Sequence, residues 1–440
     1  MYRVRRFHRL AAMQFALLCA TLIFSAHALA QEHLTVLHCW TEHRNDWVNE
    51  MLDAFEAAHP GVTVTGQLTT CGNTILEEFI TQVIGGTPPD VVMIHSLNIP
   101  GVVDRGFLQP LDAHLGRDNI SMDTWYPSEI ETARWNGQLY GLPMRTGGDT
   151  NSLLYINKTA FAEAGVADVP TTWNEWLDTA QKLTRYDGDR LTRAGSAFYG
   201  GDFSEAAWFV SGGGKIFSDD ARRVEFSQNA GVEAVTFMKD AGDRIYRAGW
   251  PEVNAMFEQM DQSTYGSGPR GAFASGRLAM WPNGILEYSY LDQNFADLDF
   301  GIGIRPALEA GGPSGVNAGT FHWAMVQGAK DTSLTWELVK WLSLREETAG
   351  YFMLRQARPS PVRAFNSNPA YFEMNPEWLI VGEALARSTS LPMLPVTAQI
   401  LNVLASAVGS ALFGDADPGT ALEQAAAQAQ GILDEHWSGR

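Results

Sequence analysis

Cysteine and basic residues are scarce in this chain. Its 440 residues include three Cys, and 31 Lys and Arg stand against 50 Asp and Glu, for a net charge of −19. A chain this acidic repels phosphate backbones and anionic lipid, so nucleic acid and membrane surfaces are excluded as expected partners. The acidic residues are scattered along the chain rather than clustered, as on an ordinary solvated surface.

Motifs for cofactors and for catalysis are also missing. No G-x-G-x-x-G follows a predicted strand, no G-x-x-x-x-G-K-S/T occurs, and the GGGK segment at 212–215 has the wrong spacing. No G-x-S-x-G, H-E-x-x-H or S-x-x-K accompanies the predicted fold pattern. The ten His are dispersed along the chain. We therefore predict no metal site and no cofactor.

Long apolar runs are absent after the first thirty residues. Within those thirty, Arg3, Arg5, Arg6 and Arg9 precede an apolar run over 10–24, and Ala28-Leu29-Ala30 follows it. These are the three parts of a secretory signal peptide. The run is shorter than the roughly 20 apolar residues that span a bilayer, although a retained anchor helix is the alternative. We expect cleavage after residue 30 and a soluble periplasmic chain with 27 basic and 50 acidic residues, a net charge of −23.

Two cysteines remain after this cleavage, Cys39 and Cys71. Each follows a strand-like segment, 34–38 and 62–68 respectively. If these strands are parallel neighbours, their carboxyl ends lie side by side, where a bridge is geometrically natural. In an oxidising compartment an even pair of cysteines is normally bridged, so we predict a Cys39–Cys71 disulfide.

The mature chain is long enough for two domains, because roughly 410 residues exceed what one hydrophobic core serves. Strands at 34–38, 62–68 and 91–94, separated by single helices, predict a right-handed β-α-β-α-β unit. After a flexible crossing at Gly147-Gly148, a strand at 152–156 opens a region expected to be mostly helical up to about residue 317. Helices are predicted near 173–184, 204–211, 228–247, 271–276, 332–355, 377–388, 396–412 and from 417 on, with further strands ending at Trp281 and over 301–304 and 321–327.

Polar and aromatic residues follow the three strands of the first unit. Ligands of parallel sheets bind beyond the carboxyl ends of the strands, near the topological switch point. An aromatic ring, a carboxylate, hydroxyls, an amide and an imidazole are expected to meet at this edge, from Trp40, Thr41, Glu42, Asn73, His95 and Ser96.

Seven short segments, in matching order and spacing over nearly the whole mature chain, resemble the family of extracellular solute-binding proteins that includes the maltose-binding protein. They are FEAAHPGV at 55–62, GTPPDVV at 86–92, RGFLQPLD at 105–112, GQLYGLP at 137–143, LYINK at 154–158, PTTWNEW at 170–176 and FASGRLAM at 273–280.

The resemblance implies an α/β protein with the two-lobe periplasmic-binding-protein fold of type II, a hinge and a ligand cleft between the lobes. The lobes are expected to comprise residues 31–146 plus 320–356 and residues 147–319 plus 357–440, with hinge crossings near 146–150, 317–320 and 356–359. It further implies a monomer that delivers a carbohydrate to the permease of an ATP-driven (ABC) importer in the inner membrane.

A sugar site needs flat aromatic faces for C–H groups, flanked by carboxylates, amides or Arg for hydroxyls. Trp40, Trp208 and Trp281 are the stacking candidates, although most of the fourteen Trp are expected in the core. Glu42 and Asp149 are expected to accept hydroxyls, with helix caps or solvated acids as their alternative. Asn283 follows Trp281, and Gly319 permits close ligand approach beside its neighbours. The remaining candidates are Thr320, Phe321, Arg145 and Arg358.

Two arginines depart from the family pattern. Arg145 stands where many members have aromatic or small residues, and Arg358 lies near the last crossing. Two guanidiniums suit a carboxylate or phosphate, so an anionic ligand such as glycerol 3-phosphate, its diesters or a sugar acid is the alternative to a neutral sugar. A second alternative is an exported glycan-acting enzyme, since Glu42 and Asp149 could act as a carboxylate pair. We expect a binding protein rather than an enzyme.

Overall fold

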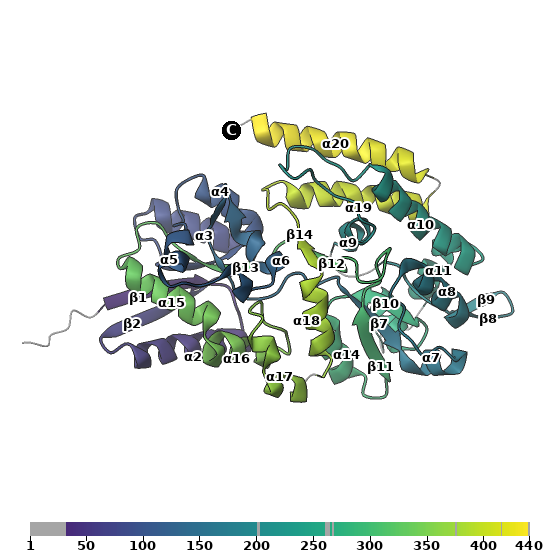
Figure 1. The fold of residues 1–440 in the computed structure, drawn as a ribbon, viewed down its shortest axis with the longest axis horizontal. Coiled ribbons are helices and arrows are strands. Elements are labelled where there is room, and N and C mark those ends of the chain that lie inside the picture. Colours follow the sequence, from purple (N-terminus) through teal and green to yellow (C-terminus); the bar gives the residue numbers. More distant parts are fainter. Residues whose placement is uncertain are drawn as a thin grey trace, which may run out of the picture.

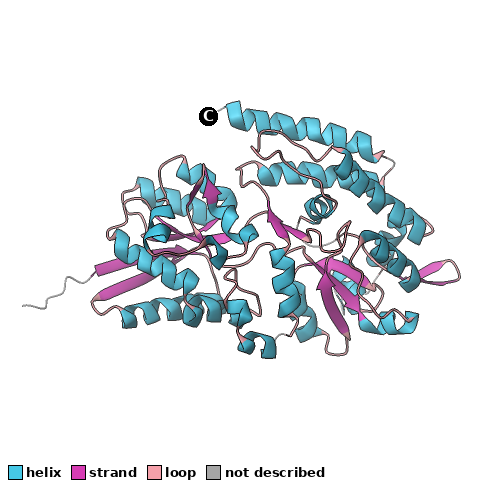
Figure 2. Cartoon of the chain, in the orientation of Figure 1, coloured by secondary structure: helices cyan, strands magenta, loops and turns pink. Residues whose placement is uncertain are grey.

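The structure is a computed structural model that describes residues 32–199, 203–259, 265, 268–374, 376–414 and 416–438. The predicted signal peptide lies outside the described residues. The chain forms two lobes side by side, each with strands inside and helices outside (Figures 1 and 2). The expected two-lobe α/β architecture is confirmed. No helix in the described ranges is both long and apolar enough to cross a bilayer.

The first lobe is built around a five-stranded sheet with the order β2-β1-β3-β13-β6 (Figure 1). Its strands are β1 (Glu32–His38), β2 (Val62–Leu68), β3 (Val91–His95), β13 (Phe321–Met325) and β6 (Leu142–Pro143). The first three are parallel and β13 is antiparallel to both its neighbours. The predicted β-α-β-α-β unit is therefore confirmed.

Helices cover this sheet because their apolar faces recur at helical spacing. The helices of the first lobe are α2 (His43–Ala58), α3 (Asn73–Ile84), α4 (Ile99–Val103), α5 (Asp112–Arg117), α6 (Pro127–Ile130), α15 (Thr332–Leu344) and α16 (Tyr351–Arg355), and the short pair β4 (Arg134–Trp135) and β5 (Gln138–Leu139) lies beside them. Val91, Val92 and Met93 of β3 are at most 1% exposed, as a central parallel strand requires. The predicted single helix over 332–355 is interrupted by a π-helical turn at Glu346–Gly350.

The second lobe has a three-stranded antiparallel sheet with the order β10-β7-β11. The sheet comprises β7 (Leu153–Asn157), β10 (Met280–Asn283) and β11 (Phe300–Ile304). The helices of this lobe are α7 (Lys158–Ala164), α8 (Trp173–Leu183), α9 (Ser204–Ser211), α10 (Asn229–Ile245), α11 (Gly249–Glu258), α13 (Gly268–Ala274), α14 (Leu286–Asn294), α19 (Thr397–Phe413) and α20 (Pro418–Ser438). The lobe also contains a hairpin of β8 (Arg185–Asp187) and β9 (Arg190–Arg193). The predicted helices match within a few residues. The hairpin, in a region expected to be helical, was not predicted.

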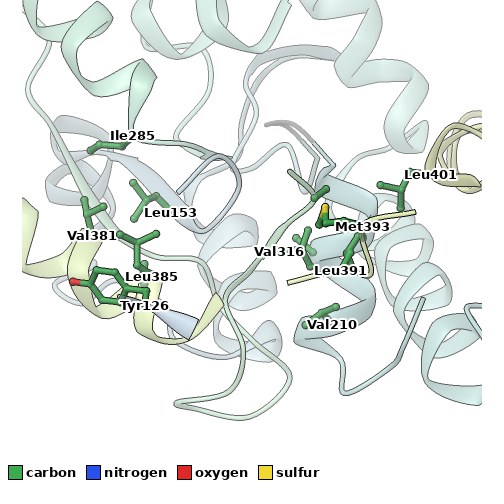
Figure 3. Packing of buried hydrophobic residues seen from close by; sticks show 14 of the residues in the cluster. Tyr126, Leu153, Val210, Ile285, Val316, Val381, Leu385, Leu391, Met393 and Leu401 are labelled. Atoms are coloured by element: carbon green, nitrogen blue, oxygen red, sulfur yellow. The ribbon is translucent and has the colours of Figure 1, made fainter. Parts of the chain in front are cut away.

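A pair of strands and a helix lie between the lobes. Strands β12 (Gly315–Asn317) and β14 (Ser388–Ser390) pair in parallel, and α18 (Trp378–Ala386), which follows α17 (Pro369–Met374), contacts both α6 and β11. Figure 3 shows Val381 and Leu385 of α18 beside Tyr126 of the first lobe and Leu153 of the second. One continuous hydrophobic cluster therefore runs through the hinge region.

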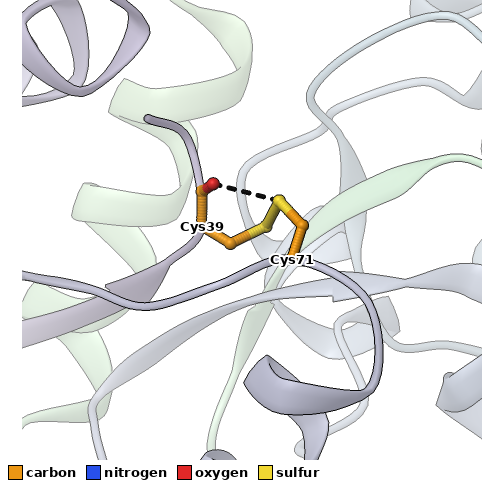
Figure 4. Close-up of a disulfide and its surroundings, with 2 residues drawn as sticks. All are labelled: Cys39 and Cys71. Atoms are coloured by element: carbon orange, nitrogen blue, oxygen red, sulfur yellow. Dashed lines mark hydrogen bonds between the residues drawn. A yellow bond between two sulfur atoms is a disulfide. The ribbon is translucent and has the colours of Figure 1, made fainter. Parts of the chain in front are cut away.

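The two cysteines form the predicted disulfide. The register of β1 and β2 pairs His38 with Leu68, which brings the two strand ends together. The Cys39 and Cys71 Cα atoms are 4.9 Å apart, and Cys71 Sγ lies 3.0 Å from the carbonyl oxygen of Cys39 (Figure 4). The bridge ties the loop after β1 to the loop after β2, at the carboxyl edge of the sheet.

Candidate functional site

Aromatic rings gather at the carboxyl edge of the first sheet. Trp40 follows β1, and its ring centroid lies 5.8 Å from Phe321 at the start of β13 and 6.4 Å from Phe352 of α16. The imidazole of His95, at the end of β3, meets Phe321 edge-on at 5.1 Å. The parallel strands and the antiparallel β13 thus bring together three residues that are far apart in the sequence.

Guanidinium groups lie on this aromatic pair. The Arg145 guanidinium carbon is 5.6 Å from the Phe321 ring centroid, and that of Arg44 is 4.3 Å from the Trp40 ring. Arg44 was not among the predicted site residues. Its position in the first turn of α2, four residues after Trp40, was the available signal, since a helical residue at this spacing reaches back over the preceding turn.

An ion pair links two of the segments that were predicted as hinge crossings. Arg358 Nη2 lies 3.3 Å from Asp149 Oδ2, the same oxygen to which Thr146 donates at 2.8 Å. Asp149 is fully buried and Arg358 is 5% exposed. Both line a cavity of about 90 Å³ together with Asn283 of β10. Asp149 Oδ1 and Arg358 Nε are buried without a hydrogen-bond partner among the described residues.

The backbone after β12 is held close to β3. Gly319 has φ of +143°, and a Cβ at this position would lie 2.5 Å from Cε1 of His95, so only glycine fits. The Thr320 backbone donates to Ser96 Oγ at 3.0 Å, and its hydroxyl donates to the Arg145 carbonyl at 3.0 Å. Ser96 and Thr320 are fully buried. Their polar groups hydrogen-bond to neighbouring segments of the site and do not face the solvent.

A buried carboxyl group connects two of the predicted hinge crossings. Glu129 of α6 accepts hydrogen bonds from the Gly147 and Gly148 backbone at 2.8 and 2.9 Å and from Asn317 Nδ2 at 2.9 Å. Ser388 of β14 donates to the carbonyl of Gly148 at 3.1 Å. Burial, then the charge of Asp149, raises the pKa of Glu129 to about 7, against the lowering effect of the backbone donors.

The electrostatic environment of the edge suits neutral and anionic groups. Burial, and then the charge of Arg145, lowers the pKa of His95 to about 4, so its imidazole is neutral at pH 7 and can both donate and accept. Burial, and then Arg358, lowers the pKa of Arg44, while Glu42 acts in the opposite direction. No group of His, Cys, Asp and Glu within the described ranges is arranged to hold a metal ion.

Two of the predicted stacking residues, Trp208 and Trp281, are buried inside the second lobe. Trp208 is fully buried in the second lobe, with its ring parallel to Trp176 at 5.2 Å, because α9 turns this side chain into the helical core. Trp281 is 4% exposed between the rings of Tyr155 and Phe273. Strand β10 places it against β7 and α13 rather than toward the other lobe. Neither ring offers a free face in this structure.

Three other predicted residues are exposed at the edge. Thr41 and Glu42 lie in the loop after Trp40, and Glu42 has φ of +54° and makes no side-chain cap to α2. Asn73 is exposed at the start of α3, beyond the outer strand β2 and next to the disulfide. The structure therefore joins Trp40, Arg44, His95, Arg145, Asp149, Phe321 and Arg358 into one region, with Glu42 at its rim.

Comparison with known proteins assigns the chain to a family. The family model for bacterial extracellular solute-binding proteins matches residues 41–349, well over half of the chain. A putative binding protein from Brucella abortus is 23% identical over 399 residues, which covers 88% of this chain and 90% of that protein.

Solved structures agree in fold. The sugar-binding protein MalE from Xanthomonas citri has a TM-score of 0.73 at 16% identity, covering 92% of this chain and 98% of that one. The cyclic alpha-maltosyl-1,6-maltose binding protein from Arthrobacter globiformis has a TM-score of 0.69 at 20% identity, covering 91% and 98%. From the family match and the two-lobe architecture, the chain belongs to the bacterial extracellular solute-binding proteins of family 1, the binding components of ABC transporters.

Proposed function

We propose that this solute-binding protein binds a sugar or oligosaccharide between its lobes and delivers it to the permease of an ABC importer in the inner membrane. The observation that carries the proposal is the aromatic pair Trp40–Phe321 at the carboxyl edge of the sheet, with Arg44 and Arg145 lying on its rings. Phe321 is partly exposed and stacks on sugar C–H groups, Trp40 (6% exposed) packs against Phe321 and supports it, and the guanidiniums donate to hydroxyls.

The buried polar groups beside this pair support the same ligand class. The unpartnered Oδ1 of Asp149 is an acceptor for a hydroxyl, and Asn283 lines the same cavity. The neutral imidazole of His95 adds a donor and an acceptor. The Xanthomonas and Arthrobacter proteins of the same fold, described respectively as sugar-binding and as binding a cyclic maltosyl-maltose, are consistent with a carbohydrate.

We further propose that the lobes comprise 31–146 plus 320–356 and 147–319 plus 357–440 and close on the ligand by bending near 146–150, 317–320 and 356–359. The hydrogen bonds from Gly147, Gly148 and Asn317 to Glu129 support this hinge, since they join two crossings to one side chain. After cleavage of residues 1–30 the protein works as a periplasmic monomer.

The test is calorimetry of the mature chain against a panel of neutral and acidic saccharides. We expect at least one saccharide to bind, with scattering profiles that contract on saturation, and Trp40→Ala to weaken it on the order of 10- to 100-fold. Trp437→Ala is the matched control, because Trp437 also carries a guanidinium, that of Arg222 at 4.4 Å, but lies on α20. Binding of a non-sugar alone, or identical scattering with and without ligand, would contradict the proposal.

A further inference from the structure

Two arginines lie on the aromatic pair, and a third, from another segment of the chain, lies near them. Arg44 lies over Trp40 at 4.3 Å, Arg145 lies over Phe321 at 5.6 Å, and Arg358 follows α16, whose Phe352 packs on Trp40 at 6.4 Å. The segments are the first turn of α2, the loop after β6 and the last crossing. In a chain of net charge −19, this concentration of positive charge is local and specific.

The nearby carboxylates offset only part of the positive charge of these arginines. Asp149 pairs with Arg358 and is fully buried. Glu42 is exposed at the rim, and no carboxylate of the described residues lies within ion-pair distance of Arg44. Glu129 already accepts three hydrogen bonds from Gly147, Gly148 and Asn317, and Glu287, which lines the cavity beside Asp149 and Arg358, pairs with Arg270.

The guanidiniums of Arg44 and Arg358 also act on each other. After burial, Arg358 is the largest influence that lowers the pKa of Arg44, and it exceeds the opposite influence of Glu42. Two cations that approach each other in a partly dehydrated site repel, and an anion placed between them relieves the repulsion. The buried Nε of Arg358 has no acceptor in the described part of the chain, so it is a donor that still lacks a partner.

We infer that the ligand is an acidic saccharide, whose carboxylate or phosphate ester is bound between Arg44 and Arg358 while its ring stacks on Phe321, the partly exposed member of the aromatic pair. The inference rests on the proposed carbohydrate function and narrows it. Arg44 and Arg358 determine the preference for acidic over neutral sugar, since guanidiniums bind planar and tetrahedral anions through paired donors. Asp149 Oδ1 serves the sugar hydroxyls rather than the acidic group.

The experiment compares saccharides that differ by one acidic group. Calorimetry on the mature chain uses digalacturonate against galactobiose and glucose 6-phosphate against glucose, with sn-glycerol 3-phosphate and inorganic phosphate alone as sugar-free probes. In at least one pair the acidic member binds more than tenfold tighter, and raising the salt concentration shrinks the preference. Arg44→Gln reduces the acid-to-neutral affinity ratio on the order of 10-fold, and Arg358→Gln on the order of 10- to 100-fold.

Arg247→Gln is the matched control, because its guanidinium lies 4.2 Å over Tyr186 on the remote β8–β9 hairpin. It leaves the ratio unchanged. Arg44 is only partly buried, so Arg44→Gln keeps the test valid if loss of Arg358 unfolds the protein. Equal affinity for acidic and neutral members, or an unchanged ratio in Arg44→Gln, overturns the inference and leaves the carbohydrate function standing. Binding of sn-glycerol 3-phosphate without any saccharide overturns both the proposed function and the saccharide part of the inference.

Discussion

Trp40 of the first lobe and the packed tryptophans of the second lobe have different surroundings. In the first lobe, Trp40 ends a strand at the edge of the sheet and carries the Arg44 guanidinium. In the second, Trp173, Trp176 and Trp208 pack on one another, with centroids 4.8 and 5.2 Å from Trp208. The same residue type, at similar burial, therefore borders a charged site in one lobe and forms an aromatic core in the other. The difference comes from the elements, since Trp40 lies beyond the end of a strand, at the edge of the sheet, whereas a residue within a helix packs against the neighbouring helices.

The buried histidines whose pKa values are lowered to about 4 or below lie in the sheet of the first lobe. His38, His95 and His322 belong to β1, β3 and β13 of the first sheet, and burial lowers their pKa values to about 4, 4 and 3. The aromatic cluster of the second lobe consists of Trp and Phe side chains, which do not titrate. We therefore expect the stability of the first lobe to depend on pH and on the disulfide, and the stability of the second lobe to depend on the packing of its aromatic side chains.

The largest expected effect comes from the second lobe. Trp208→Ala should cost about 3–5 kcal/mol of stability, because it opens a large cavity under the rings of Trp173 and Trp176. Urea unfolding at pH 7 measures the loss. Trp437→Ala, which removes a partly buried ring near the end of α20, should cost less. If Trp208→Ala instead weakened saccharide binding at unchanged stability, the assignment of Trp208 to the core would be wrong.

Removing the disulfide should have the next largest effect, in the first lobe. The bridge closes a loop with a sequence separation of 32, so the Cys39→Ser, Cys71→Ser double variant should lose roughly 3–4 kcal/mol. Thermal unfolding gives the size of the loss. Hydrogen exchange should show increased opening in β1 and β2 while β7 and β10 stay protected. Equal opening in both lobes would contradict the comparison.

Acid should destabilise the first lobe. His38, His95 and His322 stay neutral when folded but take up protons near pH 6.5 when unfolded, so each contributes stability above pH 6.5 that is lost as the pH falls toward 4. Glu129 acts in the opposite direction, since its raised pKa, about 7 against 4.5, means that the folded state holds the extra proton between these values.

The net uptake on unfolding near pH 5.5 is about two protons, or roughly 2–3 kcal/mol of stability lost per pH unit. Urea unfolding at pH 7, 6 and 5.5 measures this slope. A stability that is flat or rises from pH 7 to 5.5 would contradict it.

The smallest expected effect comes from replacing Glu129, the buried carboxyl group that Gly147, Gly148 and Asn317 contact. Glu129→Gln cannot titrate, so its stability should fall with acid more steeply than that of the parent by about one proton, or roughly 1.4 kcal/mol per pH unit between pH 5 and 6.5. The same urea series on the variant tests this. Glu131→Gln is the control, because Glu131 is exposed and pairs with Arg134 on the surface. Identical slopes for Glu129→Gln and the parent would show that Glu129 is ionised throughout this range.

Much of the fold followed from local patterns. The β-α-β-α-β unit, the second-lobe helices and the disulfide were predictable, because apolar periodicity and the strand-to-loop position of Cys39 and Cys71 are properties of short segments. The β8–β9 hairpin was missed because its strands are short and rich in Arg and Asp. The β12–β14 pair joins residues more than 70 positions apart, so no local pattern could indicate it.

For the site, the sequence by itself determined which residue types follow the strands of the first sheet, and hence that Trp40 and His95 meet at one edge with Arg145 nearby. Only the tertiary structure decided that Arg44 reaches back over Trp40, that Arg358 pairs with Asp149, and that Trp208 and Trp281 are buried. The physical reason is that periodicity tells which face of an element is apolar, whereas what covers that face depends on contacts between segments hundreds of residues apart.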